Sequence, residues 1–207
     1  MKKQQKFWDR IAKSYSKQPI ADEKAYQHKL DTISDYLEPQ FNVFEFGAGT
    51  GGTALKLAPN VSSILASDIS DNMLEIAEQR RTEAGVENVH FKQMDIETEP
   101  LGQGVYDAIL GMSIIHLLSD RAHVFRNVSE GLKPGGLFFS STVCMGTSNF
   151  FLRFILPIAR PFGLLPNVQF IDESQLISEL EAAGFAIEHR HRPRPDAAVF
   201  LVARKTG

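Results

Sequence analysis

The segment VFEFGAGTGG, residues 43–52, decides the fold. A short apolar run that includes Glu45 gives way to four glycines within six residues. Glycines between a strand and a helix let the backbone take positive φ and approach a ligand without an intervening Cβ. Open α/β sheets bind their ligands at the carboxyl ends of strands, which is where this loop would lie. The segment therefore predicts a strand, a ligand-binding loop and a helix.

Strands and helices alternate outward from this loop. The apolar patterns predict strands at 41–46, 61–67, 89–94, 105–112 and 137–143, and helices at 52–59, 70–85 and 119–132. A helix at 172–184 and two strands at 185–191 and 197–205 follow, and the strands are joined by a short link. This order predicts an α/β fold that is Rossmann-like and doubly wound. We expect a mostly parallel, seven-stranded sheet with a C-terminal antiparallel hairpin.

The 207 residues suit a single domain. Two helical segments at 7–18 and 22–37 precede the first strand, and we expect residues 1–38 to form an N-terminal helical lid. Residues 145–171 are apolar but contain three prolines, so they do not continue the alternation. We expect this insertion to be a cap over the substrate.

Composition and charge exclude several classes of function. The net charge is −3, so no overall field draws the chain to nucleic acid or to anionic lipid. The single cysteine, Cys144, allows no internal disulfide, and the six histidines form no metal-binding pattern. The basic opening MKKQQKFWDRIAKSY lacks the apolar core of a signal peptide. We expect a cytoplasmic protein without a bound metal and without a nucleic-acid partner.

An acidic residue follows the glycine loop at a sequence separation typical of a ribose-binding carboxylate. Asp68 ends the second expected strand, 21 residues after Gly47 (68 − 47). A carboxylate at that place can accept hydrogen bonds from both hydroxyls of a ribose. The ligand is therefore expected to be an adenosine-bearing cofactor. Gly47, Gly49 and Gly52 also satisfy G-x-G-x-x-G, so a nicotinamide dinucleotide stays open at this point.

Five segments occur in the order found in one enzyme family. They are FEFGAGTGG (44–52), ASDISDNMLEIA (66–77), KQMDIETEP (92–100), YDAILGMSIIHLL (106–118) and GLKPGGLFFSS (131–141). Together they resemble the motifs of the class I S-adenosylmethionine-dependent methyltransferases. The resemblance covers about residues 41–143. It is to the small-molecule type, similar to the ubiquinone/menaquinone-biosynthesis-like enzymes.

The resemblance implies S-adenosylmethionine as cofactor and S-adenosylhomocysteine as product. It places Asp68 on the ribose, Asp95 on the adenine amino group and Glu45 near the ammonium of the methionine part. Two alternatives stay open, because Met73 could be plain helix core and Asp95 a strand-end turn cap. The implied cofactor-binding residues are Tyr15, Glu45, Gly47, Ala48, Gly49, Asp68, Ile69, Met73, Asp95, Ile96 and Met112.

The N-terminal segment FWDRIAKSY resembles the opening of small-molecule methyltransferases, in which an aromatic residue closes over the cofactor. Tyr15 is the first candidate for that residue and Trp8 the second. The alternative for Trp8 is an anchor that holds the helix on the core.

Methyl transfer by in-line displacement mainly requires alignment of donor and acceptor. His116, in the loop after the fourth strand, is the candidate general base, and its alternative is a packed histidine with one satisfied nitrogen. The fourth motif does not read Asn-Pro-Pro-Tyr or Asp-Pro-Pro-Tyr, which argues against a nucleic-acid base amine as acceptor. The apolar insertion favours a small apolar or amphipathic acceptor, and a transient contact with a membrane surface is its alternative.

Two other functions remain as alternatives to the methyltransferase. One is an NAD(P)-dependent oxidoreductase on a similar sheet, which the absence of a Tyr-x-x-x-Lys pair and the terminal hairpin disfavour. The other is a module that binds S-adenosylmethionine without catalysis.

Overall fold

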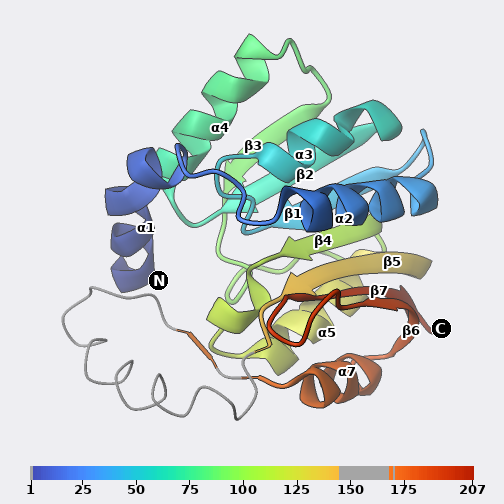
Figure 1. The fold of residues 1–207 in the computed structure, drawn as a ribbon. Coiled ribbons are helices and arrows are strands. Elements are labelled where there is room, and N and C mark those ends of the chain that lie inside the picture. Colours follow the sequence, from blue (N-terminus) through green and yellow to red (C-terminus); the bar gives the residue numbers. More distant parts are fainter. Residues whose placement is uncertain (1, 145–167, 170) are drawn as a thin grey trace, which may run out of the picture.

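The computed structural model describes residues 2–144, 168–169 and 171–207, and it shows one sheet covered by helices (Figure 1). All but three residues of the expected cap at 145–171 lie outside the described residues. The prediction for that segment therefore stays a prediction.

The sheet has seven strands in the order β3-β2-β1-β4-β5-β7-β6. Strands β1 to β5 pair in parallel, whereas β7 is antiparallel to both β5 and β6. This confirms the predicted mostly parallel sheet with a C-terminal hairpin. The strands are β1 (Asn42–Phe46), β2 (Ser63–Asp68), β3 (Val89–Gln93), β4 (Tyr106–Met112), β5 (Leu132–Thr142), β6 (Phe185–His191) and β7 (Val199–Lys205).

Helices cover both faces of the sheet (Figure 1). Buried residues of α2 and α3 join one apolar cluster, and those of α5 and α7 join the other. Within the described ranges, every helix is too short or too polar to cross a bilayer. The helices are α1 (Lys2–Tyr15), α2 (Glu23–Tyr36), α3 (Gly52–Leu57), α4 (Asp71–Glu83), α5 (Arg121–Gly131) and α7 (Glu173–Ala182), with 3₁₀ turns η1 (Ala58–Asn60) and η2 (Ile115–Leu117).

The strand order reverses between β1 and β4. From β1 the chain adds β2 and β3 on one side and then returns to add β4 and β5 on the other. Helices that follow β1 and β4 start on opposite sides of this switch point, which leaves a crevice at the carboxyl edge. The glycine loop between β1 and α3 lies at that edge.

Two element boundaries were predicted wrongly. The first helix was expected at 7–18, but α1 begins at Lys2 and ends at Tyr15. The fifth strand was expected at 137–143, but β5 begins at Leu132 and includes the KPGG segment, residues 133–136. The pairing with β4 shifts there, from Tyr106↔Leu132 to Ala108↔Leu137. Gly135 has φ +72°. A proline and a positive-φ glycine are therefore accommodated as a bulge in a continuous strand.

Candidate functional site

The glycine loop is built from residues that need the left-handed region of backbone space. Gly47, Gly49 and Gly51 have φ of +66°, +55° and +76°. The Ala48 amide donates to the Ser67 carbonyl at 2.9 Å, which fixes the loop to the end of β2. The Gly51 amide closes the turn onto the Ala48 carbonyl at 3.0 Å.

The glycines serve two different purposes. A Cβ on Gly47 would lie 2.7 Å from Ile114, and one on Gly51 would lie 2.7 Å from Phe91, so both positions are needed for packing. A Cβ on Gly49 would meet nothing within 4 Å. Gly49 instead lines a cavity, so its missing side chain leaves room for a ligand.

Asp68, at the end of β2, faces the same cavity and holds the loop. Its Oδ2 accepts from the Gly49 amide at 2.8 Å, and its Oδ1 accepts from the Ser70 amide at 2.9 Å. Burial raises the pKa of this carboxyl, and the backbone donors, including the Gly49 amide, oppose that rise. Each oxygen keeps further lone-pair capacity, because a carboxylate can accept about four hydrogen bonds.

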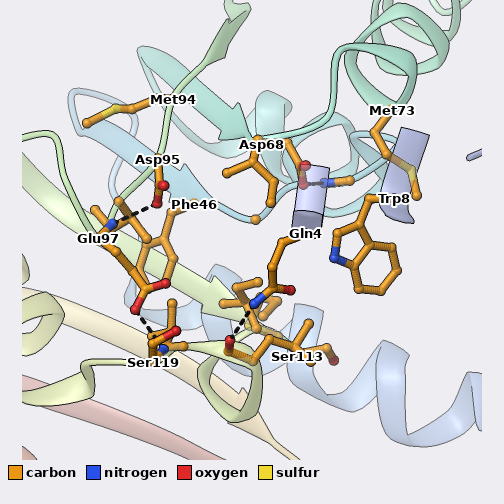
Figure 2. Close-up of a pocket in the computed structure, with 18 of the residues that line it drawn as sticks. Gln4, Trp8, Phe46, Asp68, Met73, Met94, Asp95, Glu97, Ser113 and Ser119 are labelled. Carbon is orange, nitrogen blue, oxygen red and sulfur yellow. Dashed lines mark hydrogen bonds between the residues drawn. The ribbon is translucent and has the colours of Figure 1, made fainter. Parts of the chain in front are cut away.

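The cavity has a volume of about 310 Å³ and lies along the carboxyl edge of the sheet. Its apolar wall comes from α1, α4, β1 and the loops after β3 and β4. In Figure 2, Trp8 and Met73 lie at one end and Asp95 and Glu97 at the other. The lining residues are Gln4, Trp8, Tyr15, Phe46, Gly47, Gly49, Asp68, Ile69, Met73, Met94, Asp95, Ile96, Glu97, Met112, Ser113, Ile114, Leu117, Leu118 and Ser119.

Most of the residues chosen from the sequence meet in this cavity. The alternatives for Met73 and Asp95 also hold, because Met73 is buried and the Asp95 Oδ1 accepts from the Glu97 amide at 3.0 Å. Both residues therefore combine a structural role with a place at the cavity. The predicted residues in the lining are Tyr15, Gly47, Gly49, Asp68, Ile69, Met73, Asp95, Ile96 and Met112, and the second-choice aromatic Trp8 joins them.

Polar groups of the cavity are mainly hydrogen-bond acceptors. Three of the lining residues are acidic, namely Asp68, Asp95 and Glu97, and the described lining contains no lysine, arginine or histidine. The Gln4 Oε1 is buried without a partner among the described residues. A ligand that carries several donors or positive charge fits such a lining.

Glu45 and Ala48 do not line the cavity, and their expected contact with the cofactor stays a prediction. Successive side chains of a strand point to opposite faces, and Phe46 takes the cavity side of β1. Glu45 therefore points to the other face, where it is 2% exposed and its Oε2 is without a described partner. Burial raises the pKa of Glu45 to about 8, although a hydrogen bond from the Ala54 backbone opposes the rise.

His116 also lies outside the lining of the cavity. It sits in η2, half-buried, with Nδ1 unpartnered among the described residues, and burial lowers its pKa. Its carbonyl accepts from the Gln169 amide at 2.6 Å. The burial fits the alternative of a packed histidine, but no satisfied ring nitrogen is seen among the described contacts, and its role as general base stays a prediction.

Nine lining residues were not predicted from the sequence, and three of them are Gln4, Glu97 and Ser113. Gln4 lines the cavity from α1, and its Nε2 donates to the Leu117 carbonyl at 3.5 Å. Glu97 accepts from the Ser119 and Asp120 amides at 2.6 and 2.8 Å, which holds the start of α5. Ser113, at the end of β4, has φ 60°, the one positive φ among the described non-glycine residues. A strained residue beside a cavity is a common mark of a functional site.

Helix α1 is fastened over the cavity at two places. The Asp9 Oδ1 accepts from the Ser70 hydroxyl at 2.6 Å, and the Asn72 side chain donates to the Asp9 carbonyl at 2.9 Å. The Arg80 guanidinium donates to the Thr50 hydroxyl at 2.7 Å and to the Ser16 carbonyl at 2.8 Å. Arg80 thus joins the end of α1 to the glycine loop.

Comparison with known proteins gives one family. Residues 43–136 match the methyltransferase domain family. The chain is 35% identical over 99 residues to YcgJ of Bacillus subtilis, an uncharacterized methyltransferase, and the match spans 48% of this chain and 39% of YcgJ. The crystal structure of YcgJ superposes with a TM-score of 0.73 at 20% identity, and covers 87% of this chain and 99% of YcgJ.

Longer relatives are found among fungal synthases. The chain is 26% identical over 185 residues to the highly reducing polyketide synthase lcsB of Purpureocillium lilacinum. The match spans 81% of this chain but 7% of that synthase. This relative therefore shares one small part of its length with the present chain.

Proposed function

We propose that this chain is a class I S-adenosylmethionine-dependent methyltransferase and that it transfers a methyl group to a small apolar or amphipathic acceptor. The observation that carries the proposal is the acceptor-rich cavity at the glycine loop, with three acids and no cationic side chain in its described lining. S-adenosylmethionine brings an ammonium, a sulfonium, a ribose and an adenine amino group, which are positive or donate hydrogen bonds, and one carboxylate, which backbone amides of a glycine loop can bind. A dinucleotide would bring a pyrophosphate, which such a lining disfavours.

The residues of the chain have separate tasks in this proposal. Asp68 binds the ribose hydroxyls, Asp95 accepts from the adenine amino group, and Ile69 and Met73 contribute apolar contacts to the cofactor. Gly49 lets the methionine part approach the loop. Bound S-adenosylmethionine supplies an electrophilic methyl on a sulfonium, whose departure as a neutral thioether needs no acid. Trp8 and Tyr15 of α1 exclude water from that side of the cavity.

Binding and turnover test the two parts of the proposal separately. Calorimetric titration is expected to show binding of S-adenosylmethionine and S-adenosylhomocysteine, and none of NAD. Incubation of cell extracts with the protein and methyl-labelled S-adenosylmethionine is expected to label a small organic-soluble product. Tight NAD binding without binding of either sulfur cofactor would overturn the assignment. Cofactor binding without label in any fraction would favour the non-catalytic module.

Replacing Asp68 by alanine is expected to weaken the binding of S-adenosylhomocysteine by about 2–3 kcal/mol, or roughly 30- to 150-fold. The change removes the ribose acceptor and the partner of the Gly49 amide. The measurement is the dissociation constant by calorimetry.

Asp107→Ala is the matched control. Asp107 also holds a backbone amide, that of Asn42 at 2.9 Å, but at the amino edge of the sheet. Its replacement should leave the dissociation constant within about twofold. Equal dissociation constants for wild type and Asp68→Ala would remove Asp68 from the site.

A further inference from the structure

The outer face of α1 carries a line of positive charge. An α-helix turns by about 100° per residue, so positions 3, 6, 10 and 13 fall within an arc of roughly 80°. One further cation follows in the turn after the helix. All five of these side chains are exposed, and they form what we call the basic stripe: Lys3, Lys6, Arg10, Lys13 and Lys17.

The four lysines of the stripe are not neutralised by the part of the chain that the structure describes. Lys3, Lys6, Lys13 and Lys17 form no ion pair with any residue that the structure describes. The Arg10 guanidinium lies over the Phe7 ring, 5.5 Å from its centroid. The acid of α1, Asp9, is held by Ser70 and Asn72 of the α4 start. In a chain with a net charge of −3, the stripe is therefore a local concentration of positive charge.

An exposed apolar side chain follows one end of the stripe. Ile20 is 46% exposed and lies three residues after Lys17 in the chain. Tyr15 is also exposed, at 44%, but it lies on the face of α1 that lines the cavity and is not part of the stripe. An aliphatic side chain beside exposed lysines suits the headgroup layer of a bilayer.

The opposite face of α1 is already occupied. Gln4 and Trp8 line the cavity from that face, and Ala12 is fully buried. The helix therefore cannot turn its apolar face into a membrane without leaving the protein, and contact through the stripe is electrostatic. Because a helix with side chains is about 10–12 Å across, such contact would hold the cavity directly behind α1, near the surface.

We propose that the basic stripe docks the protein onto the surface of an anionic lipid bilayer. Each exposed Lys or Arg near such a surface adds to binding, and four or five together suffice for a reversible attachment. Lipid is favoured over nucleic acid because four of the five cations are lysines rather than arginines, and because Trp8 faces the cavity and is not offered for base stacking. The docking brings the cavity to acceptors that reside in a bilayer.

Vesicle flotation tests the docking without knowledge of the acceptor. The full chain is mixed with vesicles of phosphatidylcholine alone or with about one third phosphatidylglycerol. We expect at least tenfold stronger binding to the anionic vesicles, and its loss in about 0.5 M salt because screening weakens exposed charge contacts. The combined change of Lys3, Lys6, Lys13 and Lys17 to glutamine should lower the binding at least tenfold, with unchanged melting temperature and S-adenosylhomocysteine affinity.

A second variant separates the stripe from net charge. Changing Lys24, Lys56, Lys92 and Arg126 to glutamine removes the same charge from exposed positions on other elements. This variant should bind anionic vesicles as the wild type does. Equal loss in both variants, equal binding of the wild type to both kinds of vesicle, or tighter binding to duplex DNA than to anionic vesicles would each overturn the proposal.

Discussion

Replacing Gly49 by valine is expected to lower the affinity for S-adenosylhomocysteine at least about a thousandfold, or roughly 4 kcal/mol. A Cβ at this position meets no protein atom within 4 Å, so the new side chain projects into the cavity rather than into the core. There it occupies the space of the ligand beside Asp68. Calorimetric titration of the variant checks the result.

The control must separate the filling of the ligand's space from the effect of backbone strain. Valine at positive φ is strained wherever it is placed. Gly85 supplies that control, since it has φ +64° and open space around its Cβ, and it follows α4 away from the cavity. Gly85→Val should lose stability by a similar amount and keep the ligand affinity within about twofold. If Gly49→Val bound as tightly as Gly85→Val, the loop would not be the binding site.

Glu45 is expected to make the stability of the ligand-free protein fall as pH rises. Burial raises the pKa of Glu45 from about 4.5 to about 8, so between these values the unfolded chain is ionised while the folded one stays protonated. The folded state then binds more protons, and the free energy of unfolding falls across this window. With about 1.4 kcal/mol per pKa unit, the loss is about 3–5 kcal/mol.

Glu45→Gln removes the proton and keeps the shape and the acceptor for Ala54. Urea unfolding of this variant at pH 5, 6.5 and 8 should give a flatter profile than the wild type, with the largest difference at pH 8. Glu130→Gln, which changes an exposed acid of α5, should keep the wild-type profile. Parallel profiles for wild type and Glu45→Gln would show that the carboxyl is ionised in the folded protein.

Local rules were enough to find the glycine loop and Asp68. Glycines after an apolar run, and an acid at the end of the next strand, depend on chain geometry that the sequence displays directly. The same kind of rule places Glu45, since side chains alternate along β1 and Phe46 and Glu45 therefore point to opposite faces. The basic stripe was also readable, because its spacing follows the helical period.

Other site residues depend on contacts between distant parts of the chain. Gln4 reaches the cavity only because Asp9 and Arg80 fasten α1 to elements more than 30 residues further on. The position of the Glu97 side chain is fixed by two amides at the start of α5. The position of Ser113 is fixed by the hydrogen bond from its amide to the Ser141 carbonyl at 2.7 Å. No periodicity or motif signals such contacts, so these residues could be assigned to the site only from the three-dimensional structure.

The position of Arg80 makes α1 and the glycine loop parts of one thermodynamic cycle. A single guanidinium holds both the Ser16 carbonyl and the Thr50 hydroxyl, so order in either segment lowers the entropy cost of ordering the other. The coupling is reciprocal. If closure of α1 over the cavity raises the affinity of the loop for its ligand, the bound ligand stabilises the closed α1 by the same free energy. Filling of the loop and closure of the helix therefore favour each other to the same extent, without any movement of the sheet.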